Sequence, residues 1–456
     1  PYDAGWLGLE PKPYPCALKE EKGAFALAET DGKEFCRFRF YTAEKAQYAA
    51  EGDTLTCKAR GNELTFTVGI GDAPAFGEGS ADALFKRGKE YFSSLLDACR
   101  TQTPQPLLSA AFRCAVVEQD NTHRGDGWLE GGHWFSCYWT NNFQISAALA
   151  LGQDEAVRRA LAFFGTRKDG YNCIDAMGNN AWLYHTREGE KNYGYEGLPY
   201  YLYELDEYVQ ATGDISVVKE VFPGVDRALR YMLRIRADKN SGLLGWRHGC
   251  NAFLYQADSL SLPGAASSPS VMIGSVLKKF AALAERIGEK DAAAFYEEKG
   301  SFLLRKAREL LWDEEDGAYV SHTDGDGAKH SAHYYTDYVF PALYGQESET
   351  DAARSLYRLK ERLTFRSDET DELLMRVGEL RPSMFGNNNV MPTQSAEAAR
   401  AFFSIGDAQT GADLLSGVAR AATVFTEQPG SFPERMDDAG KGEYNYVFGN
   451  PSASYI

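Results

Sequence analysis

The chain has 456 residues, and its 48 lysines and arginines against 65 aspartates and glutamates give a formal net charge of −17. This acidity argues against nucleic acids and anionic membranes as partners, because binding phosphates requires a concentrated basic surface. The length and an apolar fraction of 44% suffice for a large core or two domains, and they exclude the disordered and fibrous classes.

The first predicted unit is an antiparallel β domain over residues 1–80. Residues 35–41 and 64–68 alternate between apolar and polar side chains, which is typical of half-buried strands. Gly61-Asn62 lies between residues 54–60 and the second of these segments and predicts a hairpin turn there.

A linker over residues 81–106 follows. In residues 81–99 the apolar side chains are spaced by three and four, which predicts a helix. Residues 101–106 contain two prolines and predict a loop.

From residue 107 to residue 456 the chain is predicted to be almost wholly helical. The helices come in five pairs, 142–152 with 154–165, 197–212 with 215–236, 270–288 with 290–312, 334–345 with 349–364 and 391–406 with 408–425, and an eleventh helix begins within 451–456. Most pairs are joined by a short turn such as Gly406-Asp407, in which glycine ends one helix and the acid favours the positive end of the next. Long connections between the pairs hold nearly all the tryptophan, asparagine and glycine. Short turns at one end and long loops at the other predict an α/α toroid of helical hairpins with one functional face.

Three motifs lie in these long connections. Residues 432–440 (FPERMDDAG) are followed by 448–453 (FGNPSA), residues 139–143 (WTNNF) precede an Ala/Leu helix, and residues 242–246 (GLLGW) precede Asp258. The first motif is similar to the Pro-Glu-Gln plus Asp-x-x-x-Gly segment that carries the catalytic base of glucoamylase-like enzymes. Residues 107–456 thus resemble the six-hairpin, (α/α)6-barrel glycosidases, the superfamily of glucoamylase, trehalase and the glycogen-debranching glucosidase. Asn141 and Asn142 stand where that family usually has Arg and Asp, so a standard glucose subsite is not expected.

Glu434 is the predicted general base. An inverting glycosidase uses two carboxyl groups roughly 6.5–9.5 Å apart, one protonated to assist the leaving oxygen and one ionised to activate water. Glu434 follows Pro433 in a loop without helical periodicity and matches the base of the resembled motif. A non-catalytic loop acid that pairs with Arg435 or caps a helix is the competing interpretation, and Glu443 is the alternative base.

Asp258 is the predicted general acid. It is the one carboxylic residue in 246–258, and the aromatic and apolar residues 253–255 near it in sequence would raise the pKa of such a group. The competing interpretation is an N-cap or Asx turn before Ser259. Glu196 is a third candidate acid or a contact to a sugar hydroxyl.

Glycine-rich loops hold tryptophans that are unsuited to a regular core, and sugar stacking is the predicted use of Trp128, Trp134 and Trp182. Trp139 opens a helix, so core packing and substrate binding are equally open for it, and Trp312 at a helix end is predicted to lie in the core. The full predicted substrate-binding set is Trp128, Trp134, Trp139, Asn142, Trp182, Glu196, Trp246, Arg247 and Glu443.

No metal ion and no cofactor are predicted. Several candidate ligands crowd residues 322–333, but their spacing fits neither a calcium loop nor a known zinc site, and solvated histidines in a turn are favoured. The eight cysteines are scattered singly, and most are interpreted as buried thiols.

The favoured function is an inverting glycoside hydrolase that acts on an oligosaccharide or a glycan end, with a carbohydrate as its partner. One alternative is a polysaccharide lyase or uronyl hydrolase on the same toroid, for which His133, Asn142 and Arg247 would neutralise a substrate carboxylate. Another is a non-catalytic glycan-binding protein that keeps the tryptophan loops. The longest apolar stretches, such as residues 147–151, are far shorter than the roughly 18–20 residues that cross a bilayer, so no membrane span is expected. Localisation stays open.

Overall fold

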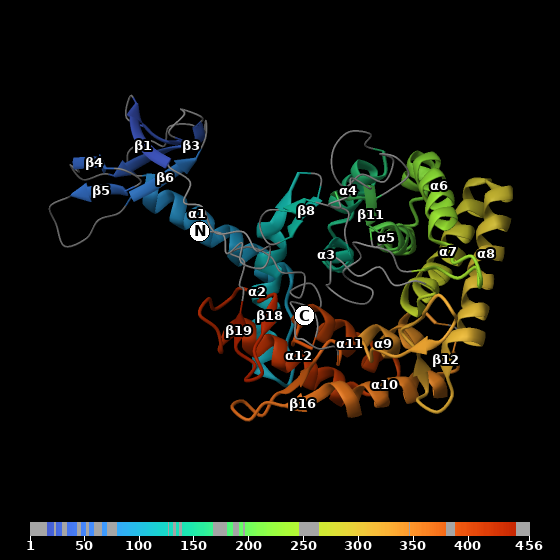
Figure 1. Cartoon of the computed structure of the whole chain (residues 1–456). Helices are drawn as coiled ribbons and strands as arrows, with labels where there is room; N and C mark the ends of the chain where they lie inside the picture. Colours follow the sequence, from blue (N-terminus) through green and yellow to red (C-terminus); the bar gives the residue numbers. More distant parts are fainter. Residues whose placement is uncertain are drawn as a thin grey trace. The chain divides into compact units, whose positions relative to one another are not determined.

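The chain divides into two compact units, Pro1–Ala98 and Cys99–Ile456 (Figure 1). The computed structural model describes six strands between residues 16 and 70, and residues 80–443 except 126, 131–133, 136–138, 167–179, 186–190, 195–196, 246–263, 346 and 380–387.

The first unit is built on an antiparallel sheet. Strands β1 (Cys16–Glu21), β2 (Ala24–Glu29), β3 (Glu34–Thr42) and β6 (Phe66–Ile70) form a sheet in that order, and β4 (Gln47–Glu51) pairs with β5 (Thr54–Lys58). Helix α1 (Ser80–Ala98) completes this unit, and its Phe85 and Tyr91 side chains are exposed.

The predicted hairpin around Gly61-Asn62 is wrong. The strand that precedes it, β5, pairs with β4, and the strand that follows it, β6, pairs with β3. Alternation of apolar and polar residues locates a strand in the sequence. It does not determine which strand it pairs with, because every strand with the same period presents a compatible face.

The second unit consists of helices arranged in hairpins (Figure 1). Its described helices are α2 (Pro106–Thr122), α3 (Trp139–Ala150), α4 (Asp154–Thr166), α5 (Gly197–Thr212), α6 (Ser216–Arg236), α7 (Ser267–Ile287), α8 (Lys290–Leu311), α9 (Tyr335–Leu343), α10 (Glu349–Leu363), α11 (Pro392–Ser404) and α12 (Ala408–Thr423). The ten predicted helices are confirmed as α3 to α12, with ends that agree within three residues. Gly288 and Gly406 have φ of 93° and 84° in the short turns, a left-handed backbone that glycine adopts without strain.

Burial separates an inner ring from an outer ring. Helices α3, α5, α7, α9 and α11 pack on one another in series, and residues 335–341 of α9 and 392–399 of α11 are buried without a break. The outer helix α10 buries one face only: its buried residues recur at spacings of three and four, as Ala352, Ser355, Leu356, Leu359 and Leu363. This difference is expected when inner helices are covered on both sides and outer helices face water.

Helix α2 was not predicted. It begins with Pro106 at its first turn and packs against α12 in the outer layer. Apart from Val116, its buried residues are small or polar, as Ala111, Ala115, Glu118 and Gln119 show, so it lacks the large apolar stripe that marks an amphipathic helix.

Short hairpins decorate the long connections. They are β7 (His123–Arg124) with β8 (Gly127–Glu130) and β9 (Trp134–Phe135), β10 (Asn180–His185) with β11 (Lys191–Gly194), β12 (Trp312–Asp313) with β13 (Ala318–Tyr319), β14 (His322–Thr323) with β15 (Lys329–His330), β16 (Thr364–Arg366) with β17 (Leu373–Met375), and β18 (Arg435–Met436) with β19 (Gly442–Glu443). Each lies in a connection that follows an outer helix along the chain.

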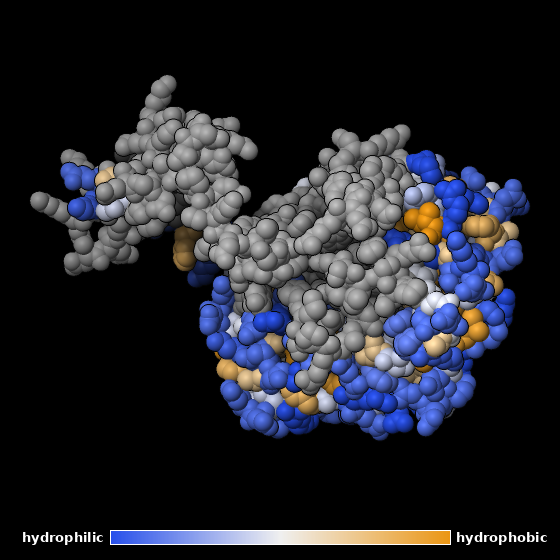
Figure 2. All heavy atoms as spheres, viewed as in Figure 1, coloured by the Kyte–Doolittle hydropathy of each residue, from blue (hydrophilic) through white to orange (hydrophobic). Residues whose placement is uncertain are grey.

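The described surface of the helical unit is mostly hydrophilic in the view of Figure 2, with hydrophobic side chains scattered over it. Within the described part of the chain, no helix combines the length and the apolar character needed to cross a membrane.

Candidate functional site

A series of hydrogen bonds links the connections that precede α7, α9 and α11 with the chain that follows α12. Ser267, at the start of α7, donates its N–H to the Ser321 carbonyl at 3.0 Å. Tyr335, at the start of α9, donates to Val377 at 2.8 Å. Val377 donates to Asn389 before α11 at 3.0 Å, and Met436 after α12 donates to Val390 at 2.9 Å. The connections before three inner helices and the chain after α12 are therefore joined to one another. We call this hydrogen-bonded set of segments the rim.

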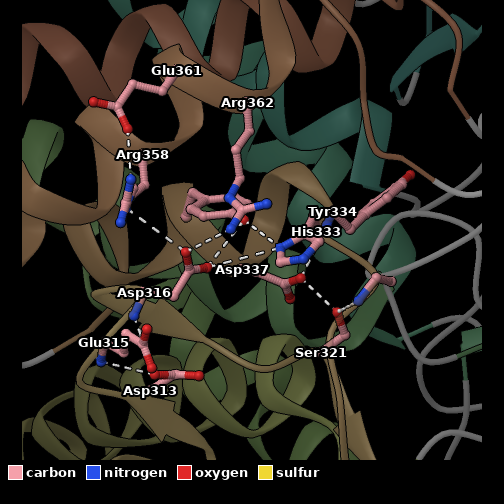
Figure 3. Close-up of polar contacts among 12 residues, drawn as sticks. Asp313, Glu315, Asp316, Ser321, His333, Tyr334, Asp337, Arg358, Glu361 and Arg362 are labelled. Carbon is pink, nitrogen blue, oxygen red and sulfur yellow. Dashed lines mark hydrogen bonds and ion pairs between the residues drawn. The ribbon is translucent and has the colours of Figure 1, made fainter.

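Asp337 links the segments before α7 and α9, which the backbone hydrogen bonds above do not join directly. Its carboxylate accepts the Ser321 hydroxyl at 2.6 Å and the Tyr334 N–H at 3.0 Å (Figure 3). It also accepts the Ser267 hydroxyl at 3.4 Å. Burial raises the pKa of Asp337 to about 7, although these three hydrogen bonds act in the opposite direction. The group is a buried structural link between the start of α7 and the start of α9.

A second carboxylate, Asp316, lies in the β12–β13 turn beside this link. Figure 3 shows Arg358, Arg362 and His333 directed toward it, with Arg362 at 3.0 Å and the His333 Nδ1 at 3.8 Å. The His333 ring also bonds the Tyr338 hydroxyl at 2.7 Å. These contacts tie the connection that precedes α9 to the outer helix α10.

Glu434 lies directly before β18, in a segment that is held on both sides by the core. Phe432 is fully buried and Met436 is 2% exposed, and both belong to a cluster that includes Val390 and Leu374. The Glu434 side chain is half-buried, and its Oε2 atom is shielded from solvent. A carboxylate on such a fixed backbone is suited to activating a water molecule in one position.

Glu443, the alternative base, is held by Arg435. Its Oε2 accepts the Arg435 Nε at 2.9 Å and Nη2 at 2.7 Å across the β18–β19 hairpin. Arg435, which was weighed as a partner of Glu434, thus pairs with Glu443. Protonation of Glu443 would weaken this charge-assisted pair.

Asp258, Trp246 and Arg247 lie outside the described residues, but both ends of their connection are described. Gly245 donates to the Arg236 carbonyl at 2.7 Å and pairs with Ala265. A Cβ at Gly245 would lie 2.6 Å from the Gly264 carbonyl oxygen, so the close approach of the two ends requires glycine. The connection that carries Asp258 therefore leaves and returns at one point of the rim, beside the start of α7.

The predicted stacking role of Trp128 does not fit its position. Trp128 is 1% exposed in the main hydrophobic core, with its ring 4.9 Å from the His123 ring, so neither face of the indole is available to a sugar. The local Gly-rich sequence suggested an open loop, but residues 127–130 form strand β8, which packs against α2, α3 and α4. Trp312 is 5% exposed and lies in the core, as predicted.

The remaining predicted contacts stay predictions. Trp134, Trp139 and Trp182 lie on β9, α3 and β10, and Asn142 lies on α3, but their side chains are outside the described part of the structure. Glu196 and His133 are outside it altogether.

The histidine-rich stretch shows no metal-binding geometry. His322 stacks on His330 with ring centroids 5.2 Å apart, and His330 contacts Asp324 at 3.1 Å. Burial, with the charge of His330, lowers the pKa of His322 to about 4. Among the described residues, no group of three or more His, Cys, Asp or Glu side chains could hold a metal ion.

Sequence reasoning missed Asp337, and it missed Arg376, which bonds the Asn388 carbonyl and the Asp438 carboxylate. An acid within the aromatic run of residues 334–340 was a usable signal for Asp337, because a carboxylate inside an otherwise apolar inner helix requires buried donors. Arg376 had no comparable local signal.

No protein-family model matches this sequence. A comparison with curated proteins also gave no match. Solved structures do share the fold. The chain is similar to a rhamnosidase from Klebsiella oxytoca with rhamnose bound, at a TM-score of 0.56 and 14% identity over 94% of this chain and 74% of that one.

Two other solved structures share this fold. A GH78 family rhamnosidase of a Bacillus species matches with a TM-score of 0.58 and 13% identity over 98% of this chain, which spans 47% of that longer protein. A GH63 mannosylglycerate hydrolase from Thermus thermophilus, in complex with Tris, matches with a TM-score of 0.53 and 14% identity over 76% of this chain and 98% of that one. The chain thus has the six-hairpin (α/α)6 fold of these glycosidases, preceded by a small antiparallel β unit.

Asp337 should make stability depend on pH. Because folding raises its pKa from 3.8 to about 7, the native state binds a proton that the unfolded state has released, and the free energy of unfolding should fall as pH rises from about 4 to about 7. The decrease in the free energy of unfolding over this range is at most roughly 4 kcal/mol. Asp337→Asn should remove this slope, so unfolding of wild type and variant should be compared between pH 5 and pH 8. Asp326→Asn, at an exposed position, is the control. If the free energies of unfolding of wild type and Asp337→Asn differ by the same amount at every pH, the prediction is contradicted.

Proposed function

We propose that this chain is an inverting glycoside hydrolase in which Asp258 is the general acid and Glu434 the general base. The observation that carries the proposal is the rim. It fastens the Glu434 hairpin to the same end of the ring as both ends of the connection that bears Asp258. The shared fold with rhamnosidases and a mannosylglycerate hydrolase supports the same reaction class.

The chemistry is a single displacement. Asp258 donates its proton to the glycosidic oxygen as the bond from that oxygen to the anomeric carbon breaks. Glu434 takes a proton from a water molecule, whose oxygen forms the new bond on the opposite face of the sugar. Each turnover leaves Asp258 ionised and Glu434 protonated, so Glu434 releases its proton to solvent and Asp258 takes one up before the next cycle.

The substrate is proposed to be an oligosaccharide or a glycan end. Trp134, Trp182 and Trp246 would stack on sugar rings, because an indole face gives a large apolar contact to a pyranose. Trp139, Asn142, Glu196 and Arg247 would contact sugar hydroxyls or the ring edge. Trp128 is left out of this set because it is buried.

The anomeric configuration of the first product tests the mechanism. A screen of aryl glycosides and oligosaccharides by reducing-sugar release identifies a substrate, and proton NMR before mutarotation should then show the configuration opposite to that of the substrate. A product that keeps the substrate's configuration would exclude Glu434 as a water-activating base. Absorbance at about 235 nm without hydrolysis would instead indicate a lyase, and tight glycan binding without turnover would indicate a glycan-binding protein.

A further inference from the structure

Arg376, directly after β17, contacts three separate segments of the rim. Its Nη1 donates to the Asn388 carbonyl at 3.1 Å, and its Nη2 donates to the Asp438 carboxylate at 2.8 Å. Its guanidinium also lies over the Phe365 ring, 4.6 Å from the centroid. One planar group therefore joins β16, the segment before α11 and the turn of the β18–β19 hairpin.

The backbone of the same residue belongs to a three-stranded arrangement. Arg376 pairs with Val390, and Val390 pairs with Met436, two residues after Glu434. The segment that holds Val390 lies between the Arg376 strand and the Glu434 hairpin. Any shift of Val390 must therefore move the acceptor of the Met436 N–H, and with it the start of the hairpin.

The middle segment contains a residue in an uncommon conformation, and Arg376 bonds its carbonyl. Asn388 has φ of 54°, in the left-handed region that asparagine adopts more readily than most non-glycine residues. Such a conformation persists when its surroundings hold it, and the bond from Arg376 to the Asn388 carbonyl is one of those restraints. The ion pair to Asp438 orients the Arg376 guanidinium but contributes little to stability, because the Asp438 side chain is 69% exposed.

We propose that Arg376 is a positioning residue for Glu434, acting through Asn388, Val390 and the β18–β19 hairpin. The proposal rests on the proposed function, in which Glu434 activates water. It adds that the alignment of this base depends on a side chain from a different helical hairpin. Since misplacing a catalytic group by about 1 Å costs roughly a hundredfold in rate, loss of the brace should act on turnover and not on substrate affinity.

The test compares Arg376→Met and Arg376→Lys with a matched control, Arg366→Met. Arg366 is on the neighbouring strand β16 and bonds the Asp371 carbonyl and Asp413, with no contact to the 388–390 segment or to the β18–β19 hairpin among the described residues. Arg376→Met should lower kcat by roughly 10- to 100-fold with KM changed less than about threefold. Arg376→Lys should be intermediate, because an ammonium group cannot reproduce the fork that reaches two oxygens. Arg366→Met should keep kcat within about twofold.

Hydrogen exchange at the Met436 amide gives a readout that needs no activity. Its exchange should be faster in Arg376→Met than in wild type and Arg366→Met. Unchanged exchange, unchanged kcat, or equal losses in Arg376→Met and Arg366→Met would each overturn the proposal. If Glu434→Gln keeps full turnover while Arg376→Met still loosens Met436, the brace exists and the base assignment of the proposed function is what fails.

Discussion

Glu434→Gln is expected to lower kcat by about 10²–10⁴-fold, because the amide cannot take a proton from the attacking water. The substitution preserves shape, and the neighbouring core residues Phe432 and Met436 are untouched, so the melting temperature should change little. KM should stay close to its wild-type value, since the base acts on water and not on the sugar.

The matched control for this prediction is Glu443→Gln on the same hairpin. It weakens the pair with Arg435 but removes no proposed base, so a loss below about tenfold is expected. Kinetics of both variants on the substrate found by the glycoside screen decide the matter. A nearly normal kcat for Glu434→Gln with a large loss for Glu443→Gln would transfer the base role to Glu443.

Asp258→Asn is expected to lower kcat by a similar factor, about 10²–10⁴-fold, on natural oligosaccharides. The loss should be much smaller on nitrophenyl glycosides. Because nitrophenol has a low pKa, its phenolate can leave without being protonated by the enzyme. The basic limb of the pH profile of kcat/KM should also disappear, since that limb reports deprotonation of the general acid.

The comparison with Glu196→Gln identifies the acid. If Glu196 binds a hydroxyl, its substitution should raise KM and affect nitrophenyl and natural substrates alike. Equal losses on both substrate types for Asp258→Asn would contradict its role as acid, and a leaving-group dependence in Glu196→Gln would move the role there.

The sequence by itself determined the helical hairpins. Their short turns are local signals: Gly406 adopts φ of 84°, and the Asp407 carboxylate accepts the Thr410 N–H at 3.1 Å, as a glycine stop and an acidic start predict. This turn marked the end of α11, which is buried over residues 392–399, and the start of α12, because a turn signal does not depend on how far the helices beside it are buried. The same signals failed for α2, whose buried Glu118, Gln119 and Thr122 resemble a surface sequence.

Only the tertiary structure decided which residues meet. The local sequence around Trp128 is that of an exposed loop, yet its strand β8 packs against three helices and its side chain is 1% exposed, which no pattern within residues 126–135 encodes. Arg376 and Asp438 are 62 positions apart, and Asp337 and Ser267 are 70 apart, so their contacts depend on how whole hairpins pack around the ring. The sequence determines that position 434 carries a carboxylate, whereas the position and environment of that side chain are set by contacts from other hairpins.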